Sequence, residues 1–134
     1  MVYQSDNSLM DCNALIINLL IQCDVYRIGS DMQVDFDRYG DIDIGFSVQD
    51  LDVPDDIADF ISMVDWKGRR VFPVVVSGGM CGNCISRVRK LTVGARAEDM
   101  LIIRYGKRSR ITKDEDIMRW ANKVRKAVGL QPLA

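Results

Sequence analysis

The chain has 134 residues, 48% of them hydrophobic, and a formal net charge of −1, which fits one globular domain over residues 1–134 and excludes a disordered chain. Its longest apolar stretch, Ala14–Ile21, is interrupted by Asn18 and is too short to cross a membrane, so we expect no membrane association. Histidine is absent, which excludes histidine-based catalytic triads and the usual histidine-containing metal sites.

The sequence alternates between patterns typical of strands and of helices. In chain order we expect a strand at Met1–Gln4, a polar loop at Ser5–Met10, a helix at Asp11–Ile21, strands at Asp24–Ile28 and Tyr39–Phe46, a helix at Pro54–Met63, a strand at Val71–Val76, a helix at Asn83–Leu91, a strand at Met100–Tyr105 and a helix at Thr112–Val128. This order predicts an α/β protein, a three-layer sandwich in which helices cover both faces of a parallel sheet.

Two local patterns make more specific predictions. Tyr39–Phe46 alternates Ile with Asp, which favours a strand with one polar face or a strand at the edge of the sheet. At the last helix, Thr112 is followed three residues later by Glu115, as in a capping box. We therefore expect Thr112 to open this helix and Gly129 to end it.

The segment from Val71 to Cys84 carries the candidate site. Val71–Val76 is apolar and mostly β-branched, which is typical of a strand buried on both faces in a parallel sheet. A glycine-rich loop, Ser77–Gly82, follows it and leads into the next helix. Ligands of such sheets bind at the carboxyl ends of the strands, so the sequence predicts a site at Ser77–Cys84.

Several segments resemble the flavodoxin family, most of all a short branch with a DxxGKxxxPxxTSGG element. Asp65–Pro73 reads DWKGRRVFP and is followed by SGG at Ser77–Gly79, while Asp37–Phe46 resembles the third strand of the family. The resemblance implies a flavodoxin-like fold with a five-stranded parallel sheet of order 2-1-3-4-5. It also implies electron transfer by flavin mononucleotide (FMN) to a redox partner protein.

By this resemblance FMN would bind at three loops. The candidate cofactor-binding residues are Ser5, Asp6, Asn7, Ser8, Leu9 and Met10 in the first loop, Phe46, Ser47, Val48 and Gln49 in the second, and Ser77, Gly78, Gly79, Met80, Gly82 and Asn83 in the third. Backbone amides and hydroxyl groups at a helix N-terminus would hold the phosphate.

The first two loops depart from the family pattern. The family phosphate loop reads S-x-T-G-N-T, whereas here Ser8 stands in place of the glycine, and Asp6 and Asp11 add charges that repel a phosphate. The second loop has no aromatic residue to stack on the flavin ring, and Phe46 is the nearest. These departures leave open an alternative, a flavodoxin fold that no longer binds flavin and acts as a scaffold or subunit.

A CxxC pair, Cys81 and Cys84, opens the helix after the third loop, where the helix dipole stabilises a thiolate. The pair has three interpretations: a catalytic dithiol of an oxidoreductase with Cys81 the more reactive thiol, a metal site that lacks two further ligands, or packing. We expect Cys12 and Cys23 to be buried on or beside the first helix. No signal-peptide pattern opens the chain, so we expect a cytoplasmic protein with reduced cysteines.

The charges are divided along the chain: residues 1–66 hold fourteen acidic residues and two arginines, whereas residues 67–134 hold sixteen basic and five acidic residues. Such a division favours a charged partner or a self-association that weakens with salt. The basic run Arg104–Lys113 offers contacts to phosphates or to an acidic protein. Nucleic acid is not expected, since Tyr105 is its one aromatic residue and no nucleic-acid-binding fold is recognised.

Overall fold

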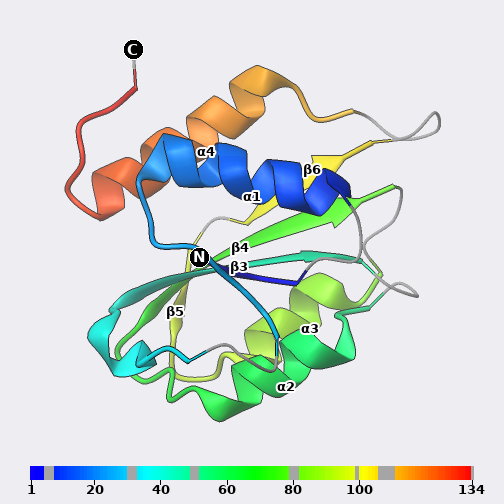
Figure 1. Ribbon diagram of the computed structural model, residues 1–134, viewed down its shortest axis with the longest axis vertical. Helices are drawn as coiled ribbons and strands as arrows, with labels where there is room; N and C mark the ends of the chain where they lie inside the picture. The colour runs from blue at the N-terminus through cyan, green and yellow to red at the C-terminus, as the bar shows by residue number, and fades with distance from the viewer. Residues whose placement is uncertain are drawn as a thin grey trace.

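The computed structural model describes residues 1–4, 8–29, 33–48, 52–78, 82–98, 100–105 and 111–133. A parallel sheet lies between two helical layers, with α1 and α4 on one face and α2 and α3 on the other (Figure 1). The elements are β1 (Val2–Tyr3), α1 (Ser8–Ile21), β2 (Tyr26–Arg27), the 3-10 helix η1 (Phe36–Arg38), β3 (Asp41–Ser47), α2 (Asp55–Met63), β4 (Arg70–Ser77), α3 (Cys84–Leu91), β5 (Arg96–Ala97), β6 (Leu101–Arg104) and α4 (Asp114–Ala127).

The sheet has the expected parallel order 2-1-3-4-5, with its fifth position divided between two short strands. The order along the sheet is β2-β1-β3-β4-β5, and β6 also pairs with β4. Arg70 of β4 is in register with Arg96 of β5, and Val74 of β4 with Leu101 of β6. The α/β fold class predicted from the sequence is therefore confirmed, while the division of the last strand was not anticipated.

The core lies in two layers, one on each face of the sheet. Alternate residues of β3 and β4 face opposite layers, as the period of a strand requires. The layer under α2 and α3 includes Ile42, Ile44, Phe46, Ile57, Ile61, Val71, Val75 and Val88. The layer under α1 and α4 includes Met10, Ala14, Ile17, Phe72, Val74, Val76, Leu101, Trp120 and Val124.

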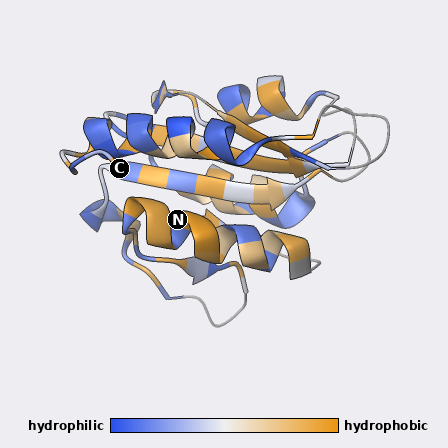
Figure 2. Ribbon diagram, turned by 90° about the horizontal axis from the view of Figure 1, so that it is seen from above, coloured by the Kyte–Doolittle hydropathy of each residue, from blue (hydrophilic) through white to orange (hydrophobic). Residues whose placement is uncertain are grey.

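Helices α1 and α4 lie side by side and differ in polarity. Viewed from above, α1 is hydrophobic along most of its length, whereas α4 carries hydrophilic residues on its outward side (Figure 2). Arg125 of α4 joins the two helices, because its guanidinium donates to the carbonyl of Leu20 at 2.7 Å and to the carbonyl of Gln131. This buried arginine satisfies a carbonyl in the last turn of α1, where the helix itself provides no donor.

The starts of helices α1 and α4 differ from the positions predicted from the sequence. Helix α1 begins at Ser8, so the predicted loop Ser5–Met10 is shorter than expected. Helix α4 begins after Lys113, whose N–H donates to the Asp116 carboxylate at 3.3 Å, and Thr112 does not open it. Gly129, with φ of 84°, follows the end of α4 as predicted.

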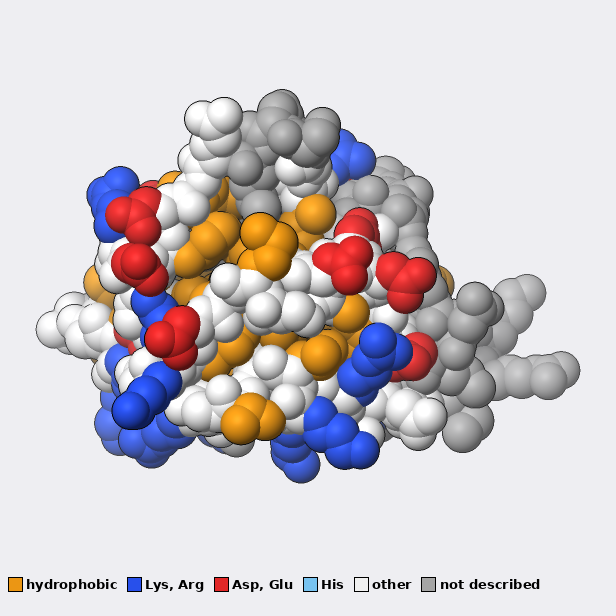
Figure 3. Space-filling model, turned by 90° about the horizontal axis from the view of Figure 1, so that it is seen from below, with side chains coloured by type: hydrophobic (Ala, Val, Ile, Leu, Met, Phe, Trp, Pro, Cys, Tyr) orange, Lys and Arg blue, Asp and Glu red, His pale blue; other side chains and the backbone are white. Residues whose placement is uncertain are grey.

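The acidic and basic halves of the chain occupy different parts of the sheet. Strands β1, β2 and β3 come from the acidic half, and β4, β5 and β6 from the basic half. On the face covered by α2 and α3, Lys and Arg side chains lie mostly along one rim (Figure 3). The molecule is therefore dipolar across the sheet, with the boundary between β3 and β4.

The Ile/Asp strand has the predicted polar face, which carries Asp41 and Asp43, but its predicted edge position is wrong. Strand β3 pairs with β1 on one side and with β4 on the other, and Asp43 is only 6% exposed. At the start of β3, the Asp41 carboxylate forms an ion pair with Arg70, with 2.5 Å between Oδ1 and Nε. Asp43 lies two residues further along the strand, on the same face. Alternation of Asp with Ile resembles a solvent-facing strand, but here α1 and α4 cover that face.

Burial raises the pKa of Asp43 to about 7; the Met1 amino group opposes this increase and Asp41 adds to it. A carboxyl whose pKa is raised on folding prefers to be neutral in the folded state. Its effect on stability is therefore most favourable below the pKa of the unfolded chain and is lost as the pH rises towards 7.

None of the helices in the described ranges is long and apolar enough to cross a bilayer.

We expect Asp43→Asn to stabilise the protein more at pH 8 than at pH 5, because asparagine cannot ionise. The difference between the two pH values should be on the order of 2 kcal/mol in the free energy of unfolding, measured with urea. Asp59→Asn on the exposed side of α2 is the matched control and should show little pH dependence. Equal effects of Asp43→Asn at both pH values would contradict a raised pKa.

Candidate functional site

The candidate site lies at the carboxyl edge of the sheet, where the strand order reverses. From β1 the chain passes to β2 on one side, and β3 then lies on the other side of β1. A reversal of this kind leaves a crevice at the carboxyl ends of the two strands, and open α/β sheets bind their ligands there. Gln4 follows β1, Ser47 ends β3 and Ser77 ends β4, and all three side chains are buried.

Two of these buried side chains have an atom with no hydrogen-bond partner among the described residues. They are the carboxamide oxygen Oε1 of Gln4 and the hydroxyl oxygen Oγ of Ser47. The residues are 4% and 7% exposed. A buried polar atom without a partner costs about 1–3 kcal/mol, so each of these atoms favours a polar ligand group or a water molecule beside it. Sequence reasoning missed Gln4, although its place directly after the first strand was a usable signal.

An exposed aromatic ring lies beside the third loop. A Cβ placed on Gly78 would be 3.3 Å from Cε2 of Tyr105, so the Tyr105 ring packs against the glycine backbone. The Tyr105 N–H donates to the Ser77 carbonyl at 3.1 Å, which ties the end of β6 to the end of β4. Tyr105 is 43% exposed and supplies an aromatic surface that the sequence had not assigned to this edge.

Some of the predicted cofactor-binding residues are placed, and others lie outside the described residues. Those outside are Ser5, Asp6, Asn7, Gln49, Gly79 and Met80. Ser8 and Leu9 open α1, and Leu9 is 37% exposed. The Met10 side chain is fully buried against β3, since a Cβ on Gly45 would approach its Cε to 2.9 Å.

The predicted cofactor-binding residues of the second and third loops differ in how far they are buried. The Phe46 side chain is fully buried in the layer under α2 and α3, and the Val48 N–H donates to the Val76 carbonyl at 3.0 Å. Gly82 has φ of 58°, a left-handed conformation that favours glycine, and Asn83 is exposed just before α3. The structure thus brings Ser47, Ser77 and Gly78 together at one edge.

Asp11 adds an acidic group in the first turn of α1. Its Oδ1 is buried without a hydrogen-bond partner among the described residues, although the Asp11 side chain forms a hydrogen bond with the Tyr3 side chain. Burial, and then the Asp11 carboxylate, raise the pKa of Tyr3. A carboxylate in this turn offsets the positive end of the helix dipole and disfavours an anionic ligand there.

Comparison with known proteins identifies the architecture. No protein-family model matches the chain, and no curated protein matches its sequence significantly. Solved structures that match over 96% of this chain and 95% of their own include oxidised Flavodoxin 1 from Bacillus cereus (TM-score 0.70, 17% identity) and the flavodoxin of Streptococcus pneumoniae TIGR4 (TM-score 0.71, 17% identity). The chain has a flavodoxin-like fold. At this identity the likeness concerns the fold and not the chemistry.

The cysteines of this flavodoxin-like chain differ in exposure. Cys84 is fully buried in the first turn of α3, and Cys81 lies outside the described residues. The expectation that Cys12 and Cys23 are buried is wrong: α1 turns Cys12 to the surface, and Cys23 follows the helix end half-buried. Burial raises the pKa of the Cys23 thiol. In the described ranges no three Cys, Asp or Glu side chains are placed to hold a metal ion.

We expect a small maleimide at neutral pH to modify Cys12 at least about tenfold faster than Cys84, because reagent reaches only exposed thiolates. Peptide mass mapping of the folded protein over time separates the sites, and labelling in urea is the control that should abolish the difference. Rapid labelling of Cys84 in the folded protein would show that the start of α3 opens and would favour the dithiol interpretation.

Proposed function

We propose that the chain binds flavin mononucleotide at the carboxyl edge of its sheet and transfers electrons to a redox partner protein. The observation that carries this proposal is the pair of unpartnered buried atoms at the carboxyl ends of neighbouring strands, Gln4 Oε1 after β1 and Ser47 Oγ at the end of β3. Support comes from the flavodoxin-like fold, which covers nearly the whole chain.

The residues of this edge suit a planar ligand with a polar rim. The Ser47 hydroxyl can donate or accept a hydrogen bond, and the Gln4 oxygen can accept one. The Tyr105 ring beside Gly78 offers an apolar surface against which a flat ring can lie. When bound, the flavin ring supplies one- or two-electron transfer. The chain's own part is to orient the ring, satisfy its polar rim and limit its contact with water.

A second candidate function is favoured by Asp11. Its buried carboxylate oxygen lies in the first helical turn after the loop where the resemblance places the phosphate. Negative charge there opposes a phosphate dianion, which supports the alternative of a flavodoxin-like scaffold or subunit without flavin. We propose a cytosolic location in either case, a compartment in which the four cysteines of the chain would be kept reduced.

Titration of FMN followed by quenching of its fluorescence tests the proposal. We expect binding at tens of micromolar or tighter. Ser47→Ala should weaken it about five- to twentyfold, because the variant removes a buried hydrogen-bonding group. Ser62→Ala is the matched control, since Ser62 lies on α2 and its hydroxyl donates to the Ala58 carbonyl at 2.8 Å.

Riboflavin, which lacks the phosphate, separates the ring from the phosphate contribution. Asp11→Asn should tighten FMN binding and leave riboflavin binding nearly unchanged, because the variant removes a repulsive charge near the phosphate. If neither the natural chain nor Asp11→Asn quenches FMN fluorescence, the flavin proposal fails and the scaffold function is favoured.

A further inference from the structure

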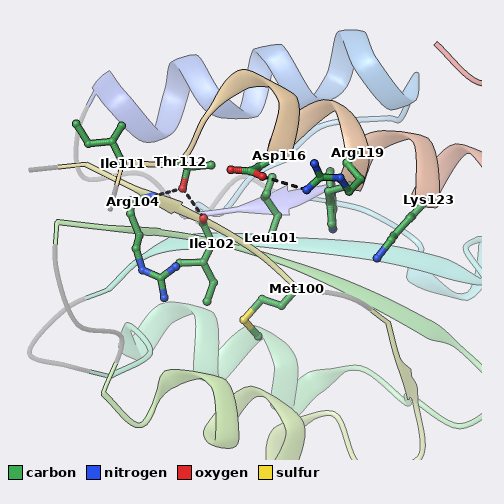
Figure 4. A pocket seen from close by; sticks show the side chains of 10 residues that line it. Met100, Leu101, Ile102, Arg104, Ile111, Thr112, Asp116, Arg119 and Lys123 are labelled. Atoms are coloured by element: carbon green, nitrogen blue, oxygen red, sulfur yellow. Dashed lines mark hydrogen bonds and ion pairs between the residues drawn. The ribbon is translucent and has the colours of Figure 1, made fainter. Parts of the chain in front are cut away.

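A separate groove runs along the outer edge of the sheet, between β6 and α4. It has a volume of about 400 Å³ and is lined by Met100, Leu101, Ile102, Arg104, Ile111, Thr112, Asp116, Arg119, Trp120 and Lys123. Met100 and Ile102 pack towards the layer of α2 and α3, and Leu101 towards the layer of α1 and α4. The groove therefore follows both sides of the edge strand (Figure 4).

Thr112 closes one part of this sheet edge. Its hydroxyl donates to the Ile102 carbonyl at 2.8 Å and accepts from the Arg104 N–H at 2.8 Å, and its own N–H donates to the Arg104 carbonyl at 3.1 Å. Thr112 thus takes the place of a neighbouring strand beside the carboxyl half of β6. This role explains why it does not open α4.

The next part of the edge is open. A residue of a strand directs its N–H and its carbonyl to the same side, so the Ile102 N–H points outward like the carbonyl that Thr112 contacts. Among the described residues this N–H has no hydrogen-bond partner. An exposed strand edge with an open donor is a template for an extended segment of another chain.

The side chains around the open edge are mainly basic. Arg104, Arg119 and Lys123 line the groove against one carboxylate, Asp116. That carboxylate is already engaged, since it bonds to Arg119 at 3.1 Å and accepts from the Lys113 N–H. Arg104 forms no ion pair within the described part of the chain, and the Arg119 side chain is 67% exposed. The groove therefore has an excess of positive charge around an apolar floor that includes Leu101.

We propose that this groove binds an extended acidic segment of a partner protein, laid along β6 so that its backbone pairs with Ile102 and its carboxylates meet Arg104, Arg119 and Lys123. Apolar side chains between the carboxylates would reach the floor of the groove. The charges decide the chemistry of the partner, because positive and negative surfaces steer and orient one another on association.

Other ligands fit this groove less well. Single-stranded nucleic acid needs exposed rings for base stacking, and the aromatic residue of the groove, Trp120, is only 5% exposed. The cations lie on opposite sides of the edge strand and do not surround one point, so together they would not enclose a small anion (Figure 4). An extended chain can contact both sides, because its successive side chains alternate.

A fluorescein-labelled decapeptide with the repeat Glu-Glu-Val-Val tests the proposal, because this repeat puts carboxylates on both faces of an extended chain. A decapeptide with the repeat Lys-Lys-Val-Val is the control. The acidic peptide should raise fluorescence anisotropy with a Kd on the order of 10–100 μM at low salt and bind more weakly at high salt. By NMR, it should slow hydrogen exchange of the Ile102 amide. The Leu101 amide, which faces β4, is the internal reference and should change little.

Charge reversal locates the binding. Arg119→Glu with Lys123→Glu should weaken the acidic peptide at least about tenfold. Arg89→Glu with Lys90→Glu on α3 makes the same change in net charge away from the groove and should weaken it by less than about twofold. Preserved amide dispersion confirms that each variant is folded.

Three outcomes would overturn the proposal: no anisotropy change up to millimolar acidic peptide, an equal loss in both charge-reversal variants, or tighter groove-dependent binding of a dT12 oligonucleotide than of the peptide. The experiment contains no flavin, so its result does not depend on the function proposed for the carboxyl edge.

Discussion

The pairing of β3 with β4 is the constraint on which the rest of the structure depends. The two strands are in register from Asp41 opposite Arg70 to Ser47 opposite Val76, and helices cover both faces of the pair. Every side chain between these ends must therefore be apolar, neutral or hydrogen-bonded. Polar chemistry is confined to the ends of the strands and to the outer edges of the sheet, and the two candidate sites occupy those places.

The buried strand at Val71–Val76 could be predicted from the sequence because few other structures suit a run of this composition. The run Val71–Val76 is too short for a helix of its own and too uniformly apolar for a surface strand. The order of strands followed from a resemblance and not from composition. The central position of the strand with alternating Ile and Asp was missed because periodicity reports polarity, whereas burial depends on what the rest of the chain places over that face.

The candidate sites were harder to predict than the fold. Thr112 fits a capping pattern at the level of sequence. Only the position of β6 in the fold shows that its hydroxyl instead forms hydrogen bonds with the backbone at the edge of that strand. Gln4 and Tyr105 are ordinary residues until the sheet brings the ends of β1, β4 and β6 to one side. A local sequence pattern contains no information about such long-range neighbours, so Gln4 and Tyr105 escaped prediction, whereas Ser47 and Ser77 were named through the resemblance.

The division of the fifth strand has a consequence for how this fold can vary. Strand β5 is anchored to the amino half of β4 and β6 to its carboxyl half, and each keeps its own register. The chain between Ala97 and Leu101 therefore need not maintain continuous pairing. Extra residues at this junction would leave both short ladders intact, and an inserted loop would project from the rim of the sheet. The junction is a natural place for relatives of this protein to acquire new segments.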